Sequence, residues 1–527
     1  MKPYYYLIAG AFLIFGLSSC QKIIDVEPIS NEGVDNFYRN YNEVNAALTG
    51  AYNGLQAPLL NEWRMTDLRT DNVKVNVINS SSSENVLLLH MDTYELNSTH
   101  AHVYNYWISV YKNIRSINYV LENLGVSYAK GQLEFGERVA SMTEEQRDQL
   151  SGEALFLRAY HYFNLVRLYG GVFLITDPVD PKIAKQVNRS SVQDCYALII
   201  ADLKAAESRL PRIKYEQISN ANQGRATTWA AKGLLAKVFL TLGRNGEALP
   251  LLDDIIQNSG YGLENSYASV FSINNEMNKE ILFSVRYKSG GLGLGNYMAN
   301  YFAPLNSGNA VVNGDGMGHN YPTTSLSQAY RTSAPGAVDQ RKAVNIGAYN
   351  ALLYSKKFIS AVLIENDAEN DFPVLRYADI LLMKAEALGF DGPDGLAMSL
   401  INQVRQRAGG IPYSSGDFNT GLYLYPTSGA DTHAITSSEA FLNALLEERR
   451  LELAFENQRF FDLVRTGKAI EVIRNYYAEE FESHYKRYTL TLEELQAKAT
   501  PERLLLPIPQ REIDTNEEIL IIQNQGY

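Results

Sequence analysis

Cysteine, long apolar runs and clustered positive charge are all scarce in this sequence of 527 residues. Its two cysteines, Cys20 and Cys195, are too few for a disulfide framework or a cysteine-based zinc site. Apart from a short run near the N-terminus, no stretch approaches the roughly 18 apolar residues of a membrane-spanning helix. Lysine and arginine number 47 against 59 acidic residues, so the net charge is −12. Because contact with phosphates needs clustered basic residues, we expect no nucleic-acid partner.

The sequence is rich in aromatic residues, above all tyrosine. It contains 35 Tyr, 20 Phe and 3 Trp, while 46% of residues are apolar and 20% are charged. These proportions are typical of a globular protein. A tyrosine ring has an apolar face and a polar hydroxyl, so this richness favours binding surfaces as well as a large core.

Residues 1–20 have the features of an export signal. Lys2 supplies a positive charge, and an apolar run follows that is too short for a permanent span. Leu17-Ser18-Ser19-Cys20 resembles a bacterial lipoprotein processing site. The resemblance implies a signal peptide over 1–19, cleavage before Cys20 and attachment of lipid to that residue, which would be the sole membrane anchor. The alternative is an ordinary secretory signal with a chance cysteine.

Apolar residues recur at helical spacing in several segments, which predicts helices over 42–56, 104–124 and 153–168. The last of these is apolar almost all round, so we expect a buried helix that ends at Gly170-Gly171. Residues 225–258 and 378–407 each have the spacing of a tetratricopeptide-type helix pair, and 191–210 is the expected partner of 153–168. Such pairs stack into a short solenoid, so the sequence predicts a mainly α fold with a helix-pair scaffold.

Two regions lack this periodicity and are rich in Gly, Ser and Asn, namely 66–99 and 281–332. Residues 290–318 alone hold eight glycines, with tyrosines interleaved nearby. We expect long surface loops with short strands that carry the binding residues. Aromatic rings suit the flat faces of sugars and polar side chains suit their hydroxyls. The candidate ligand-binding residues are Trp63, Asp67, Asp71, Tyr297, Tyr301 and Tyr321.

Other motifs predict neither catalysis nor a bound cofactor or metal. The glycines of 291–295 have the wrong spacing for a nucleotide loop, and a flexible loop is favoured. His100 and His102 could bind a metal only with further ligands such as Asp92 or Glu95, so a surface loop is favoured. No catalytic constellation is recognisable.

The charged segment 446–465 places acidic and basic residues at helical spacing, for example Glu447 with Arg450 and Arg449 with Glu452, and Glu448 lies one turn before Glu452. Apolar residues alternate with these charges along the same segment. We therefore interpret it as a buried or half-buried ion network between helices and not as a catalytic site.

Taken together, several segments resemble the SusD/RagB family of Bacteroidetes outer-membrane lipoproteins over essentially the whole mature chain. The carrying segments are Ser19-Cys20 with Asp25, Glu27 and Pro28; Trp107-x3-Tyr111-x2-Ile114-x3-Asn118; Glu153-Ala-x-Phe-x-Arg158-Ala159; Arg376-Tyr-Ala-Asp379-Ile-Leu-Leu-x-Lys-Ala-Glu386-Ala; Ile401-Asn402-x-Val404-Arg405-x-Arg407-Ala-Gly409; Glu448-Arg-Arg450-x-Glu452-Leu-x-Phe455-Glu456; Arg459-Phe-Phe-Asp462-Leu-x-Arg465; Leu506-Pro-Ile-Pro509; and Gln523-Asn524-Gln-Gly526-Tyr527. Gln525 departs from the family's usual Asn-Pro-Gly-Tyr ending.

The resemblance implies a single domain over 20–527. Its helical scaffold would cover about 40–60, 103–260 and 374–475, its variable loops about 61–102, 281–332 and 410–436, and its extended tail 504–527. It also implies a surface lipoprotein of the outer membrane that captures a glycan and passes it to a SusC-like TonB-dependent barrel. The alternatives are capture of peptide by the same type of importer, a protein–protein scaffold, and a surface glycosidase.

Overall fold

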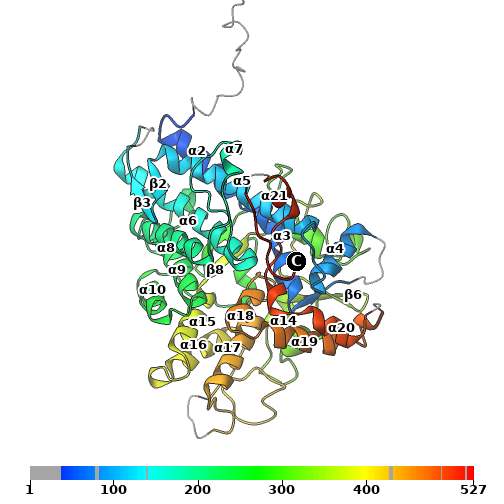
Figure 1. Cartoon of the computed structure of the whole chain (residues 1–527). Coiled ribbons are helices and arrows are strands. Elements are labelled where there is room, and N and C mark those ends of the chain that lie inside the picture. The colour runs from blue at the N-terminus through cyan, green and yellow to red at the C-terminus, as the bar shows by residue number, and fades with distance from the viewer. Residues whose placement is uncertain (1–36, 77–81, 138–140, 427–430, 488–489, 517–518) are drawn as a thin grey trace, which may run out of the picture.

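The computed structural model describes residues 37–76, 82–137, 141–426, 431–487, 490–516 and 519–527 (Figure 1). The predicted signal peptide and Cys20 lie outside these residues.

The longer helices are α2 (Tyr41–Asn53), α3 (Gln56–Met65), α4 (Ser83–Asp92), α5 (Ala101–Asn123), α6 (Glu144–Tyr169), α8 (Val192–Arg209), α9 (Thr228–Thr241), α10 (Asn245–Asn258), α15 (Tyr377–Leu388), α16 (Leu396–Arg407), α17 (Ser438–Glu452), α18 (Arg459–Arg465), α19 (Ala469–Glu480) and α20 (Leu492–Lys498). The shorter ones are α7 (Pro181–Ala184), α11 (Tyr267–Val270), α12 (Met298–Phe302), α13 (Thr324–Ala329), α14 (Arg341–Asn345) and α21 (Gln510–Asp514). The predicted mainly α fold is confirmed.

Capping groups in the sequence mark the ends of these helices. Asn40 accepts hydrogen bonds from the backbone N–H groups at the start of α2. Thr143 and Gln146 form a reciprocal capping box at the start of α6. That helix therefore begins at Glu144, upstream of the predicted start at residue 153. The sequence pattern did not reveal its first turns, because they are polar and lack an apolar stripe. Gly170, with a φ of +73°, ends it as predicted.

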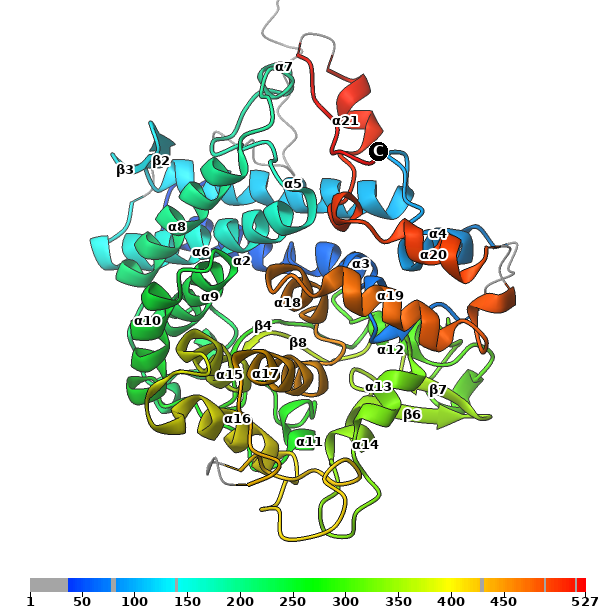
Figure 2. The same cartoon turned by 60° about the horizontal axis from the view of Figure 1, so that its bottom comes forward.

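The helices pack as successive pairs along one side of the molecule (Figure 2). α6 packs on α8, α9 on α10, and α15 on α16, and each pair contacts the next. The predicted helix pairs over 225–258 and 378–407 are confirmed, as is the pairing of 191–210 with the buried helix. The short elements α12, α13, α14, β6 (Ile346–Tyr349) and β7 (Leu352–Ser355) lie on the opposite side (Figure 2).

Strands occur as four two-stranded antiparallel sheets within the described residues. β4 (Ile281–Val285) pairs with β8 (Phe372–Arg376), and both pack against α9. The other pairs are β1 (Val73–Lys74) with β5 (Tyr321–Pro322), β2 (Val126–Ala129) with β3 (Gln132–Phe135), and β6 with β7. Because β4 is buried throughout, it fixes the start of the glycine-rich segment that follows it.

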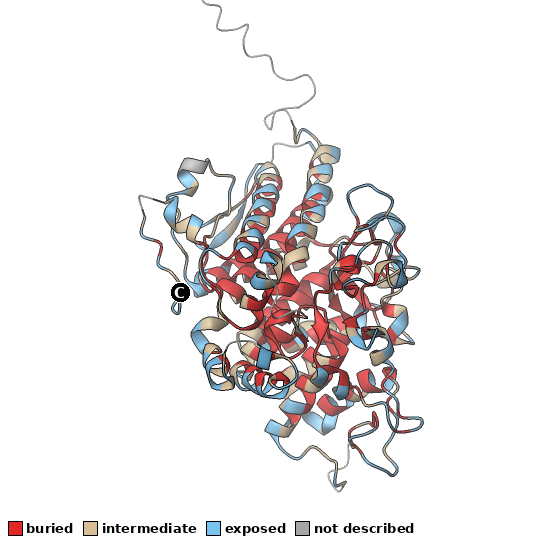
Figure 3. Cartoon of the chain, turned by 90° about the vertical axis from the view of Figure 1, so that its right-hand side faces the viewer, coloured by how far each residue is buried: buried red, intermediate tan, exposed pale blue. Residues whose placement is uncertain are grey.

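The region 61–102 differs from the expected surface loop. It contains the end of α3 and the whole of α4, and every residue from 62 to 73 is buried. Some of its polar groups bond inside the protein: the Arg69 guanidinium donates to the carbonyl groups of Arg503 (2.7 Å) and Leu504 (3.0 Å). Figure 3 shows buried residues concentrated in the middle of the molecule. This polar segment is therefore part of the interior, which its low hydropathy does not indicate.

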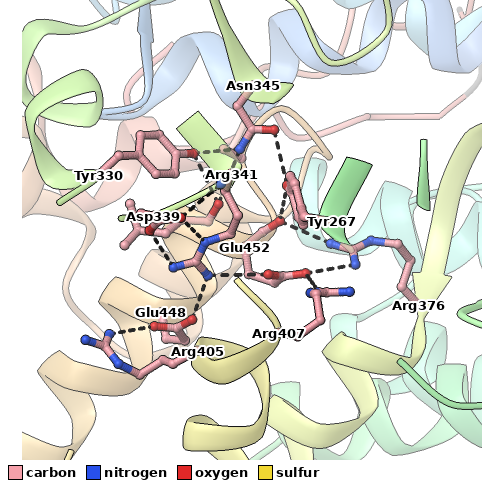
Figure 4. A network of polar contacts seen from close by, with 12 residues as sticks. Tyr267, Tyr330, Asp339, Arg341, Asn345, Arg376, Arg405, Arg407, Glu448 and Glu452 are labelled. Atoms are coloured by element: carbon pink, nitrogen blue, oxygen red, sulfur yellow. Dashed lines mark hydrogen bonds and ion pairs between the residues drawn. The ribbon is translucent and has the colours of Figure 1, made fainter. Parts of the chain in front are cut away.

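The charged segment 446–465 forms a buried ion network, as predicted (Figure 4). Arg341 and Arg376 donate to Glu452 at 3.3 and 3.0 Å, and Arg407 also contacts this carboxylate. Burial alone would raise the pKa of Glu452, but the three guanidinium groups outweigh it and hold the pKa at about 2. The network joins α17 to β8, α14 and α16, so this segment belongs to the scaffold.

Candidate ligand-binding cleft

An open cleft of about 720 Å³, here called the main cleft, lies where the α2–α3 turn, the outer face of α5 and the segment 287–297 meet. Its lining combines glycines and small residues with amides, hydroxyls, one lysine and two tyrosines. The lining residues are Gly50, Asn53, Gly54, Gln56, Ala57, Leu60, Ile108, Ser109, Lys112, Asn113, Ser116, Tyr287, Gly293, Gly295, Asn296 and Tyr297.

The wall of the main cleft between α2 and α5 depends on a close approach at Gly54. The Asn113 amide donates to the carbonyl of Ala51 at 2.9 Å and lies 2.8 Å from His161 Nε2. Burial lowers the pKa of His161 to about 3, so its ring is neutral and its nitrogen can accept this hydrogen bond. A Cβ on Gly54 would lie 2.0 Å from Asn113 Oδ1. The buried pair thus sets the distance between the two helices.

Hydrogen bonds hold the glycine-rich segment in place, in contrast to the flexible loop that was expected. The Asp367 carboxylate accepts from the backbone N–H groups of Gly290 and Gly291 at 2.7 and 2.8 Å. Asn296 and Ala368 form an antiparallel bridge. A Cβ on Gly295 would lie 2.4 Å from the Cα of Asp367, so glycine is required there. The segment therefore presents a defined surface to the main cleft.

Three of the predicted residues belong to one series of aromatic contacts that runs inward from the rim. Tyr297 is 43% exposed and meets Tyr301 edge to face at 6.1 Å between ring centroids. Tyr301 meets His319, which stacks on Trp63 at 5.7 Å. Burial, followed by the nearby Arg64 guanidinium, lowers the pKa of His319 to about 4, so this ring is neutral. Tyr297 offers an open ring to a ligand, whereas Trp63 is buried and supports the rings outside it.

The other three predicted residues are also buried. Asp71 binds the Arg459 guanidinium through both oxygens, at 2.9 and 3.0 Å, and pairs with Arg450 at 3.1 Å. Burial raises the pKa of Asp67 to about 7. Tyr321 is part of β5, and its hydroxyl accepts from the N–H of Leu305. With Trp63, these residues present no surface to a ligand in this structure.

A second cleft of about 380 Å³ adjoins the main cleft and shares Asn53, Gln56 and Tyr287 with it. The Gln56 amide donates to the carbonyl of Arg286 at 2.8 Å, which ties α3 to the segment after β4. The remaining lining residues are Thr49, Tyr52, Leu55, Ala221, Gln223, Gly224, Arg225, Ser284, Val285, Arg286, Lys288 and Leu294. The two clefts therefore lie next to each other and share part of their lining.

The histidine pair does not lie on a surface loop, so that expectation was wrong. His100 and His102 are 2% and 6% exposed, and Glu84 lies 3.3 Å from His102. Asp92 instead accepts hydrogen bonds from Tyr476 and Tyr485. Among the described residues, no group of three or more His, Cys, Asp or Glu side chains is arranged to hold a metal ion. Nor does any described helix have the length and apolarity needed to cross a bilayer.

The cleft residues of α2, α3 and α5, among them Gln56 and Lys112, were not among the predicted site residues. The stripe over 104–124 correctly identified the buried face of α5, but the cleft uses its outer face. Ile108 is 47% exposed on that face. An apolar residue outside the buried stripe of a predicted helix could have indicated a binding surface there.

Comparisons with known proteins agree with this architecture. A family model described as "SusD family" matches residues 339–527, and one described as "Starch-binding associating with outer membrane" matches 24–240. SusD-like protein P25 of Formosa agariphila is 26% identical, with 99% of each chain covered.

Solved structures agree as well. A structure titled "Laminarin binding SusD-like protein" is similar at a TM-score of 0.70 and 25% identity, covering 93% of this chain and 100% of that one. Surface glycan-binding protein A from Bacteroides thetaiotaomicron, in complex with laminarihexaose, shares the fold at a TM-score of 0.69 and 20% identity, covering 92% of this chain and 99% of that one. The chain is thus similar to SusD-like proteins over nearly its whole length, and the SusD family model matches its C-terminal part.

Proposed function

We propose that this protein is a lipid-anchored, non-catalytic glycan-binding protein of the outer membrane. It captures oligo- or polysaccharide at the cell surface and passes it to a partner TonB-dependent barrel. The observation that carries the proposal is the main cleft with the open ring of Tyr297 at its rim. The family description, which associates such proteins with starch and with the outer membrane, supports the same function.

The chemistry of the main cleft suits a sugar. The flat C–H face of a pyranose packs against an aromatic ring, as the exposed Tyr297 ring allows. Hydroxyl groups need donors and acceptors at the edges, and Asn53, Gln56 and Ser109 supply them. The second cleft adjoins the main cleft, so several sugar units can bind in a row.

The charges of the lining support binding without cleavage. Glycoside hydrolysis uses a pair of carboxyl groups on either side of the scissile bond. None of the residues that line the two clefts is an aspartate or a glutamate. A bound glycan would therefore leave this site intact.

Two relatives support a glycan over a peptide as the ligand. One is the similar structure whose title says that it binds laminarin, and the other is a structure of the same fold solved with laminarihexaose.

Calorimetry with the purified chain from residue 21 tests the proposal against a panel of soluble glycans and a peptide pool. We expect binding to a glycan and no release of reducing ends. Tyr297→Ala should lower the affinity about fivefold to a hundredfold, equivalent to about 1–3 kcal/mol for the loss of a stacking ring. Phe390→Ala is the matched control because Phe390 is 36% exposed and lies outside both clefts.

Four outcomes would contradict parts of the proposal. Binding to peptides with no response to any glycan would replace the ligand class, and release of sugar would contradict the non-catalytic role. Loss of binding in Phe390→Ala but not in Tyr297→Ala would place the site elsewhere. Affinity purification of the lipidated protein from the native membrane should recover a TonB-dependent barrel, and its repeated absence would contradict the delivery step.

A further inference from the structure

The charged residues that line the two clefts are all basic, although the whole chain carries a net charge of −12. Lys112 is the charged residue of the main cleft. Arg225, Arg286 and Lys288 are those of the second cleft. Acidic residues are in excess over the whole chain, whereas the lining of the two clefts contains basic residues and no acidic ones. The local charge of the lining is therefore opposite in sign to the net charge of the chain.

Lys112 lies exposed on the outer face of α5. Its ammonium group has no hydrogen-bond or ion-pair partner in the part of the chain that the structure describes. An unpaired ammonium group at the wall of a cleft is available to a ligand, since no carboxylate of the protein must first be displaced.

The basic groups of the second cleft have acidic partners that are less exposed than they are. The Arg225 side chain is 19% exposed while its partner Glu153 is fully buried. Arg286 is 38% exposed against 10% for Asp371, and Lys288 is 63% exposed against 28% for Glu369.

In each of these pairs the cation is the more exposed partner and the carboxylate is the less exposed one. The side that a ligand meets therefore carries positive charge, and the field of a cleft lined by one sign of charge attracts the opposite sign.

We propose that the glycan bound in these clefts is acidic, with a carboxylate or sulfate group placed against Lys112 and further anionic groups along the second cleft. The inference rests on the proposed glycan-binding function and names the ligand class of the same site. A lysine ammonium is a compact charge with rotatable donors, so it can donate hydrogen bonds to either anionic group. Tyr297, at the rim of the same cleft, supplies the ring for the sugar face.

An array of immobilised polysaccharides tests the inference. Laminarin and amylopectin serve as neutral probes, polygalacturonate and alginate as carboxylated probes, and carrageenan as a sulfated probe. We expect the strongest binder to be acidic and its affinity to fall as salt is raised, because exposed charge interactions are screened. The carboxylated and sulfated arms show which anionic group is recognised.

Two lysine variants then locate the interaction on the strongest binder. Lys112→Gln should weaken binding about threefold to tenfold, in line with the loss of one exposed charge-assisted contact. Lys204→Gln is the matched control, because Lys204 is exposed on α8 and lines neither cleft. Its affinity should equal that of the unchanged protein.

Each other result has a definite meaning. If the strongest binder is neutral and Lys112→Gln binds it normally, the acidic ligand is wrong while the glycan-binding function stands. If an acidic glycan binds equally well to both lysine variants, the assignment to Lys112 is overturned. If no polysaccharide binds, the proposed function fails together with this inference.

Discussion

Gly54 lies so close to Asn113 that a methyl group at position 54 would stand 2.0 Å from the side-chain oxygen of Asn113. The backbone of Gly54 has a φ of −59°, which any residue adopts, so the requirement for glycine here is one of space. Asn113 cannot easily move away, because its amide is bonded to Ala51 and His161. This contact links the α2–α3 turn to α5 and so shapes the main cleft.

Gly54→Ala should therefore destabilise the protein by about 1–3 kcal/mol, as overpacking of a well-packed interior does, and should weaken glycan binding by widening the main cleft. Chemical denaturation and calorimetry measure the two effects. Gly50→Ala is the matched control: Gly50 also lines the main cleft, but a Cβ there meets nothing within 4 Å. In α2 it should stabilise the protein by about 0.5–1 kcal/mol. Equal stability of the two variants would contradict this account of the contact.

Glu452→Gln tests the buried ion network. Removing this charge leaves Arg341, Arg376 and Arg407 short of a partner, so we expect a loss of about 3–5 kcal/mol in the free energy of unfolding. Arg450, which pairs with Asp71, should behave in the same direction when replaced. Glycan affinity of the folded fraction should be unchanged. Glu471→Gln is the control, because this glutamate forms an exposed pair with Lys468. If Glu452→Gln melted normally but no longer bound glycan, the network would belong to the binding site and not to the scaffold.

The same carboxylate predicts a response to acid. Its pKa in the folded protein is about 2, below the ordinary value of 4.5, so the unfolded chain takes up this proton first as the pH falls. The contribution of Glu452 is complete above about pH 4.5 and is lost as the pH falls toward about 2. The difference in stability between the unchanged protein and Glu452→Gln should shrink over that range, and a constant difference would contradict the pairing.

Asp67 predicts the opposite dependence. Burial raises its pKa to about 7, so the folded protein holds this proton more tightly than the unfolded chain does. Stability is therefore lost as the pH rises from about 4 to about 7. Asp67→Asn should gain about 2 kcal/mol of relative stability between about pH 5 and about pH 8. Asp148→Asn, at an exposed site, is the control. A gain that does not depend on pH would contradict the burial of an ionisable carboxyl group.

Lipidation at Cys20 is tested by its removal. Cys20→Ala should release a soluble and folded protein, because the lipid is the only membrane attachment that we propose. Detergent phase partitioning and thermal melting measure the two properties. A variant that stays in the detergent phase would contradict the single anchor, and one that fails to melt cooperatively would point to a role for Cys20 in the fold.

The helical scaffold could be predicted because its apolar residues recur with helical spacing. The pairs α9–α10 and α15–α16 each bury a regular face, and glycines or polar turns mark their ends. The buried network was equally visible, since Glu448 and Glu452 lie four residues apart and therefore on the same face of α17.

The candidate site was predictable only in part. Of the predicted residues, Tyr297 lines the main cleft, and its role in binding stays a prediction. Trp63, Asp67 and Asp71 had the composition of a sugar site, but tertiary packing buries all three, and Asp71 is paired with Arg459. Lys112 could not be assigned from sequence, because only packing brings the outer face of α5 against the segment 287–297.

The structure of the protein bound to the glycan selected from the array tests the central claim most directly. The account predicts a sugar ring against Tyr297 in the main cleft, an unbroken glycosidic chain that continues toward Gln56 and the second cleft, and an anionic group beside Lys112. A glycan bound on another face of the molecule, with the main cleft free of sugar, would contradict it.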